Sequence, residues 1–184
     1  MMTKKISMMI LLLSFMVVKA GIASAQPAKI DAEKNLTGLG ISLIQPVPPT
    51  ANFVKAVRSG NMVYLSGHGP DKPGGGQVTG KLGSDLTIEE GQAAARLVGI
   101  SLLSTLKSEI KDLNKVRRII KVLGLVNAIP TFEKHSVVMN GFSDLMVQVF
   151  GANGKHARSA IGVASLPNNI PVEIEMIVEL NDKD

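Results

Sequence analysis

Cysteine and tryptophan are absent from this chain of 184 residues, and aromatic side chains make up only 3% of it. Without cysteine the protein has no disulfide, no thiolate metal site and no thiol nucleophile. The few aromatic rings argue against cages for cationic ligands and against platforms on which nucleic-acid bases stack. The hydrophobic core must therefore be sufficient to hold the fold together.

The first 25 residues have the pattern of a secretory signal peptide. A short basic start ending at Lys5 precedes an apolar run over residues 6–18 and an A-x-A sequence at residues 23–25. That order is typical of cleaved signals, and the run is too short for a comfortable membrane span. An uncleaved N-terminal anchor is the alternative. We expect a signal peptide at residues 1–25 and a secreted or periplasmic mature protein that is not held at a membrane.

Much of the net positive charge lies in that leader. The formal charge of +5 falls to +2 without residues 1–25, which hold three lysines and no acid. One basic cluster lies elsewhere, within a segment that has a strand pattern: Lys115, Arg117, Arg118 and Lys121. Domains that bind nucleic acid usually carry a clustered basic face, so we expect no nucleic-acid partner.

Metal and nucleotide motifs are also lacking. The three histidines, His68, His135 and His156, do not have the spacing of a metal-binding motif. Residues 67–83 are rich in glycine and proline and predict a long loop. This loop lacks the spacing of a phosphate-binding loop, so we expect neither a metal nor a nucleotide site.

The rest of the chain predicts one domain over residues 53–184, preceded by an extended arm at residues 26–52. The prolines of that arm fix φ and disfavour helix. Strand patterns at residues 53–58 and 62–66 flank a turn and predict a hairpin. Thr87 and Glu90 form a capping box that begins a helix with apolar residues at helical spacing as far as Ile110.

Three more strands and a second helix follow. Residues 116–126, 158–164 and 172–180 have strand patterns, and residues 136–150 have the pattern of an amphipathic helix. The order β-β-α-β-α-β-β predicts an α+β fold with one sheet covered on one face by two helices. In the last strand, alternation places the apolar residues on one face and three glutamates on the other. The glutamate face has two interpretations, a solvated sheet face or a face buried between subunits where basic residues meet the carboxylates.

The C-terminal segment carries a more specific pattern. Residues 158–167 read RSAIGVASLP and residues 172–175 read VEIE, while Ser66-Gly67-His68 and Asn140 occur earlier in the matching order. This pattern resembles the reactive-intermediate deaminase (Rid, or YjgF) family over residues 53–180, with the leader indicating an exported, divergent subgroup. The resemblance implies a chorismate-mutase-like fold, a homotrimer, ligand clefts between subunits, and no cofactor.

The resemblance also implies an activity and a site. Rid proteins with the matching arginine hydrolyse imines or enamines such as 2-aminoacrylate to keto acids and ammonia. Arg158 would hold the substrate carboxylate as a guanidinium fork, and Glu173 would orient or activate the attacking water. The other residues implied to line the cleft are Phe53, Ser66, Gly67, His68, Asn140 and Ala160.

Three of these residues depart from the usual family pattern. Phe53 stands in place of tyrosine, His68 in place of glutamine, and Ala160 where some members have cysteine. Together with the leader, these departures keep an alternative open: a trimer that binds a small carboxylate without turning it over. Ribonuclease activity is a third, less favoured hypothesis. Arg158 has a structural alternative as well, as a partner of Glu173 or its neighbour Glu175 across the trimer.

Overall fold

The computed structural model describes residues 30–49 and 51–181. The predicted signal peptide at residues 1–25 lies outside them. Within the described part of the chain, no helix is long and apolar enough to cross a membrane.

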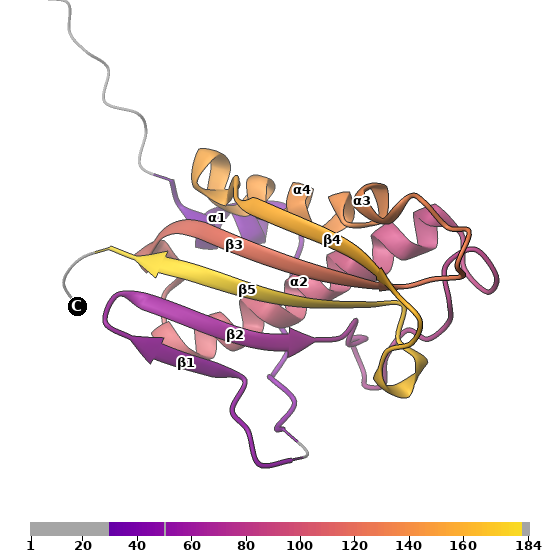
Figure 1. Ribbon diagram of the computed structural model, residues 1–184. Coiled ribbons are helices and arrows are strands. Elements are labelled where there is room, and N and C mark those ends of the chain that lie inside the picture. The colour runs from indigo at the N-terminus through magenta and orange to yellow at the C-terminus, as the bar shows by residue number, and fades with distance from the viewer. Residues whose placement is uncertain (1–29, 50, 182–184) are drawn as a thin grey trace, which may run out of the picture.

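One five-stranded sheet forms the centre of the protein, in the order β1-β2-β5-β3-β4 (Figure 1). The β3–β4 pair is parallel and the other pairs are antiparallel. The strands are β1 (Ala56–Ser59), β2 (Met62–His68), β3 (Val116–Asn127), β4 (Ala157–Val163) and β5 (Val172–Leu180). The order places β1 and β4 at the two edges of the sheet.

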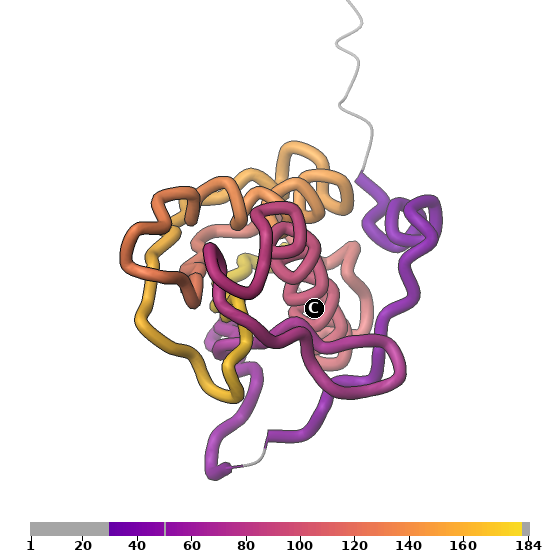
Figure 2. The backbone as a smooth tube through the Cα atoms, turned by 90° about the vertical axis from the view of Figure 1, so that its right-hand side faces the viewer, coloured from indigo at the N-terminus to yellow at the C-terminus, as the bar shows by residue number. Residues whose placement is uncertain are grey.

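Helices cover one face of this sheet. The long α2 (Ile88–Ile110) and α4 (Asn140–Phe150) pack together behind the strands, with the short α3 (His135–Val138) beside β4. Figure 2 shows the small α1 (Ala32–Gly38) at the outside of this helical layer. The α+β fold predicted from the order of elements, one sheet covered on one face, is therefore confirmed.

Two sequence patterns explain how these layers form. Thr87 accepts a hydrogen bond from the backbone of Glu90, whose carboxylate accepts one from the backbone of Thr87, so the predicted capping box begins α2. In β5 the apolar residues alternate into the core as predicted, and Val172, Ile174 and Val178 are fully buried. Burial of such side chains stabilises the fold by about 1.5–3 kcal/mol each.

Two expected features are wrong in part. The arm predicted to be extended contains α1, which is capped by the Asp31 side chain and buries Ala32 and Leu36. The prolines that suggested an extended segment, Pro46, Pro48 and Pro49, follow this helix, and packing stabilises a helix too short to form alone. The second amphipathic helix is also divided, because α3 ends at Val138 and α4 begins at Asn140.

Candidate functional site

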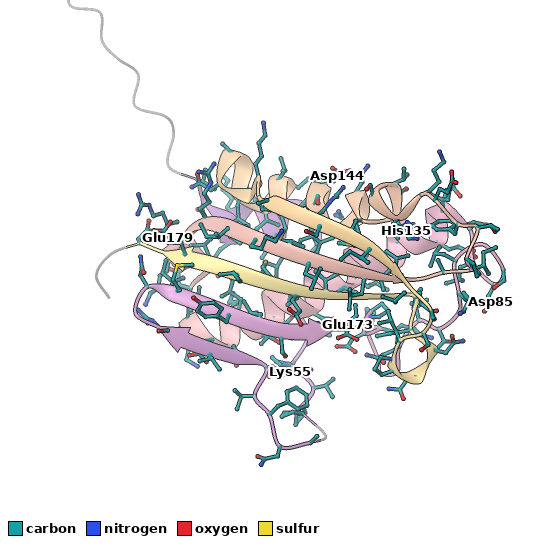
Figure 3. All side chains as sticks on the ribbon, viewed as in Figure 1. Lys55, Asp85, His135, Asp144, Glu173 and Glu179 are labelled. Atoms are coloured by element: carbon teal, nitrogen blue, oxygen red, sulfur yellow. The ribbon has the colours of Figure 1, made fainter. Side chains whose placement is uncertain are left out.

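The predicted site residues form two groups on opposite faces of the sheet. Arg158 and Ala160 are two residues apart on β4 and therefore share the face of the sheet that the helices cover. There Arg158 makes hydrogen bonds to residues of α3 and α4. Glu173 lies between two fully buried residues of β5 and therefore points to the face without helices (Figure 3). A single chain does not bring Arg158 and Glu173 together.

In the first group, which we call the Arg158 group, three hydrogen bonds orient the guanidinium. Its Nη1 donates to Asn140 Oδ1 at 3.1 Å and to Ser143 Oγ at 2.8 Å, and its Nη2 donates to the Ser136 carbonyl at 3.1 Å. These bonds use three of the five guanidinium protons. Among the described residues Arg158 has no carboxylate partner, so Nε–H and one Nη2–H are left to meet an anion.

Asn140 was predicted for this group, whereas Ser143 and His156 were not. His156 Nε2 lies 3.1 Å from Ser143 Oγ, and its Nδ1 lies 2.7 Å from the Gly154 carbonyl. Burial lowers the pKa of His156, with a further contribution from the positive charge of Arg158, while the bond to Gly154 opposes the shift. The imidazole is therefore neutral near neutral pH. The nearness of His156 to Arg158 in the sequence was the available signal.

The second group, which we call the Glu173 group, is built around a glycine. A Cβ placed on Gly67 would lie 2.8 Å from Glu173 Cδ, so the carboxylate occupies the space that a side chain would take. No hydrogen bond or ion pair holds this carboxylate among the described residues. Burial raises the pKa of Glu173, and the neighbouring Glu175 raises it further. Glu173 therefore takes up and releases its proton at a higher pH than an exposed glutamate does.

Phe53 and Gly67 line a cleft of about 310 Å³ together with Lys55, Asp71 and the prolines that precede Phe53. Phe53 is about half exposed. Ser66 is close by, and its backbone N–H donates to the Lys55 carbonyl at 3.0 Å. Lys55 was not predicted as a site residue. It supplies a positive charge at this cleft where the tyrosine hydroxyl of the family pattern is missing (Figure 3).

His68 belongs to the lining of the same cleft, but its side chain is almost wholly buried. A register irregularity between Leu65 and His68 turns the ring into the core, where its exposed fraction is 3%. Its Nδ1 donates to the Ser66 carbonyl at 2.7 Å, and its Nε2 lies 2.8 Å from Thr105 Oγ1 on α2. Both ring nitrogens are therefore engaged inside the protein, so His68 supports the β2 end of the cleft from behind.

The face of the sheet that carries Glu173 is mixed in character. Val57, Tyr64 and Ile161 expose about half of their surface on it. A pocket of about 320 Å³ there is lined by Val57, Tyr64, Lys121 and Glu175, among others. At one end Arg117 pairs with Glu179 at 2.9 Å. Basic and exposed apolar residues thus share the face with the glutamates.

Among the described residues no cluster of three potential metal ligands occurs. The two groups and the adjoining cleft contain a guanidinium with free donors, a carboxyl group with a raised pKa and a lysine.

The sequence of this chain matches a known protein family and individual known proteins. The family model described as Endoribonuclease L-PSP matches residues 44–180, and thus begins inside the predicted arm. Protein TCP17 of Trypanosoma cruzi is 44% identical over 149 residues, covering 80% of this chain and 93% of that protein.

Two solved structures resemble the whole fold. A protein of unknown function from Agrobacterium tumefaciens is 41% identical with a TM-score of 0.75, and the match covers 82% of this chain and 94% of that one. Yeast Mmf1 is 26% identical with a TM-score of 0.52, covering 74% and 93%. The residues matched by the family model include both the Arg158 group and the Glu173 group.

Proposed function

The chain belongs to the Endoribonuclease L-PSP family, which comprises the Rid (YjgF) proteins, and from that premise we propose that it hydrolyses small carboxylate-bearing imines or enamines without a cofactor. The observation that carries this proposal is the guanidinium of Arg158, which is oriented by three bonds yet keeps two donors free. A guanidinium in that state binds a carboxylate through two parallel hydrogen bonds.

The proposed site requires more than one copy of the chain. Arg158 lies at the edge strand β4 and Glu173 on the face without helices, so the two meet only when β4 of one copy approaches that face of another. We propose a homotrimer in which each cleft combines an Arg158 group with a Glu173 group. The exposed apolar residues of that face support such burial.

The chemistry follows from the two groups. Arg158 holds the carboxylate of the protonated imine, and Glu173 accepts a proton from water as the water oxygen bonds to the imine carbon. The C=N electron pair moves to nitrogen. Glu173 returns the proton to the amine nitrogen. As the C–N bond breaks, its electron pair leaves with ammonia, the hydroxyl oxygen forms the C=O bond of the keto acid, and the hydroxyl proton passes to Glu173. A carboxyl group with a raised pKa suits both halves of this proton transfer.

The first test compares wild type, Arg158→Ala and Arg96→Ala. Arg96 is a matched control because it is a half-buried arginine of α2 whose guanidinium donates to Gln148 and not to a member of either group. Imino acids are generated with an amino-acid oxidase and their hydrolysis is followed. Losing charge-assisted bonds worth about 1.5–3 kcal/mol predicts a drop in kcat/KM of roughly 10- to 100-fold for Arg158→Ala alone. A folded wild type that accelerates no imino acid contradicts the proposal.

A non-catalytic carboxylate-binding trimer is the second candidate, and Phe53 favours it because no tyrosine hydroxyl is present in the cleft. Pyruvate, the keto acid formed from 2-aminoacrylate, distinguishes the two functions. Binding of pyruvate that depends on Arg158, without imine hydrolysis, would establish the binding protein. That the mature protein is secreted or periplasmic is likewise a proposal, which cell fractionation with N-terminal sequencing tests.

The family description names an endoribonuclease, but the histidines do not favour that activity here. His68 is buried behind β2, His156 is bonded to Ser143, and His135 packs against Gly162 beside Phe132. Ribonucleases commonly need two acid–base groups that converge on one phosphate. We therefore propose no nucleic-acid substrate.

A further inference from the structure

We propose that Ser143 and His156 are positioning residues that hold the guanidinium of Arg158 in the orientation needed to bind a carboxylate. This inference rests on the function proposed above for Arg158. It adds two residues whose side chains would touch Arg158 or each other, not the ligand.

The direction of each hydrogen bond follows from the Gly154 carbonyl. A carbonyl oxygen only accepts, so His156 Nδ1, at 2.7 Å from it, carries a proton. In the neutral ring Nε2 is then bare and must accept, and the Ser143 hydroxyl at 3.1 Å donates to it. With its proton committed, Ser143 Oγ turns lone pairs toward Arg158 and accepts from Nη1 at 2.8 Å. One backbone carbonyl therefore fixes the direction of the whole series.

The local structure fixes the imidazole as firmly as the hydrogen bonds do. A side chain on Gly154 would collide with the Met146 carbonyl of α4, so the turn that ends at Gly154 packs directly on that helix. The rings of His156 and Phe142 also pack in a T-shaped pair with 5.8 Å between their centroids. His156 is thus held against α4, the helix that carries Ser143.

The same helix supplies the other side-chain partner of Arg158. Asn140 and Ser143 are three residues apart on α4 and therefore lie on one helical face, which is turned toward β4. Together they occupy both protons of Nη1. The Arg158 side chain is thus held in one rotamer before a ligand binds, with Nε–H and one Nη2–H free to donate to it. Such preorganisation strengthens binding because the side chain is already ordered before the ligand arrives.

A serine series tests this role. Ser143→Ala removes the hydroxyl, Ser143→Thr restores it, and Ser101→Ala is the matched control because its hydroxyl bonds only to the Leu97 carbonyl of its own helix, α2. Affinity for pyruvate and for pyruvamide, which lacks the carboxylate, is measured by calorimetry, together with kcat and KM for imine hydrolysis.

The expected pattern is selective. Ser143→Ala weakens pyruvate binding and raises KM roughly 3- to 10-fold, because the Arg158 side chain must then be ordered when the ligand binds and one of its hydrogen bonds is lost. Its kcat changes little, its affinity for pyruvamide is unchanged, and Ser143→Thr recovers most of the pyruvate affinity. Equal losses for pyruvate and pyruvamide, or no loss for either, overturn the proposal.

Nitrogen NMR of labelled protein gives a readout that does not depend on activity. We expect His156 to carry its proton on Nδ1, and Ser143→Ala to shift the Nε2 resonance and broaden the Arg158 Nε–H signal. A proton on Nε2, or an Arg158 signal unaffected by Ser143→Ala, overturns the proposal. If wild type neither binds pyruvate nor hydrolyses imines, the proposed function fails, and the NMR result still decides whether these residues hold Arg158.

Discussion

Replacing Gly67 by alanine tests the role of Glu173 without removing its carboxylate. A Cβ at residue 67 would lie 2.8 Å from Glu173 Cδ, whereas real Cβ atoms essentially never approach within 3.0 Å and ordinary contact begins at 3.4 Å. The carboxylate oxygen Oε1 would lie closer still to this Cβ, so the carboxylate must move by about 1 Å or more. A displacement of that size at a reacting group costs on the order of 100-fold in rate.

Stability should respond much less than activity to Gly67→Ala. The colliding atoms belong to the far end of a flexible side chain, and an altered rotamer costs about 0.5–1.5 kcal/mol. Replacing glycine in a strand returns roughly 0.5–1 kcal/mol of backbone entropy. We therefore expect a free energy of unfolding within about 1 kcal/mol of wild type, since these two contributions oppose each other.

The assay pairs urea unfolding with imine hydrolysis for wild type, Gly67→Ala and Glu173→Gln. If Glu173 moves the protons, both variants lose activity to a similar extent while remaining folded. A Gly67→Ala protein that keeps activity within a few-fold of wild type would show that the carboxylate position does not matter to the reaction. A variant that loses several kcal/mol of stability would show that the cleft is more rigid than its contacts indicate.

Two further predictions concern the scaffold. Gly141→Ala should lower the free energy of unfolding by about 2 kcal/mol or more, because the new Cβ would collide with the Gln92 backbone of α2 and this overpacking outweighs a gain of about 1 kcal/mol in helix propensity. Gly38→Ala is the control, because open space surrounds Gly38 and the substitution should not destabilise the protein. Urea unfolding of both variants at one protein concentration checks the prediction. Burial lowers the pKa of His68 below 6.5, so the unfolded chain binds its proton more tightly and stability falls as pH drops below that value. His68→Gln, which keeps hydrogen-bonding capacity beside Thr105 but does not titrate, should remove up to about 1.4 kcal/mol per pH unit of this slope; equal slopes in wild type and variant would refute the assignment.

Local patterns predicted the fold wherever one residue type repeated at one spacing. The capping box at Thr87 and the alternation of β5 depend only on nearby residues, and both were confirmed. The helix at residues 32–38 was missed because its stability comes from burying Leu36 against distant residues. The separation of α3 from α4 at Met139 has no strong breaker in the sequence.

The candidate site was predicted as a set of residues but not as an arrangement. Motif resemblance named Arg158 and Glu173, and strand alternation placed Glu173 on the face opposite the apolar residues, as the structure has it. It could not place Arg158, because which face of β4 meets the helices depends on the parallel pairing with β3. The position of His68 was beyond prediction for a similar reason, since a local irregularity in β2 reverses its side chain.

The connection from β3 to β4 contains the residues that hold Arg158 in place. Every group that contacts Arg158 or supports its contacts, from Ser136 to His156, lies in one uninterrupted stretch of sequence that ends at Arg158 itself. The Glu173 group, in contrast, is assembled from residues far apart in the chain. The residues proposed to bind the anion therefore form one continuous segment, which can be transferred as a unit between proteins of this fold without changing the residues around Glu173.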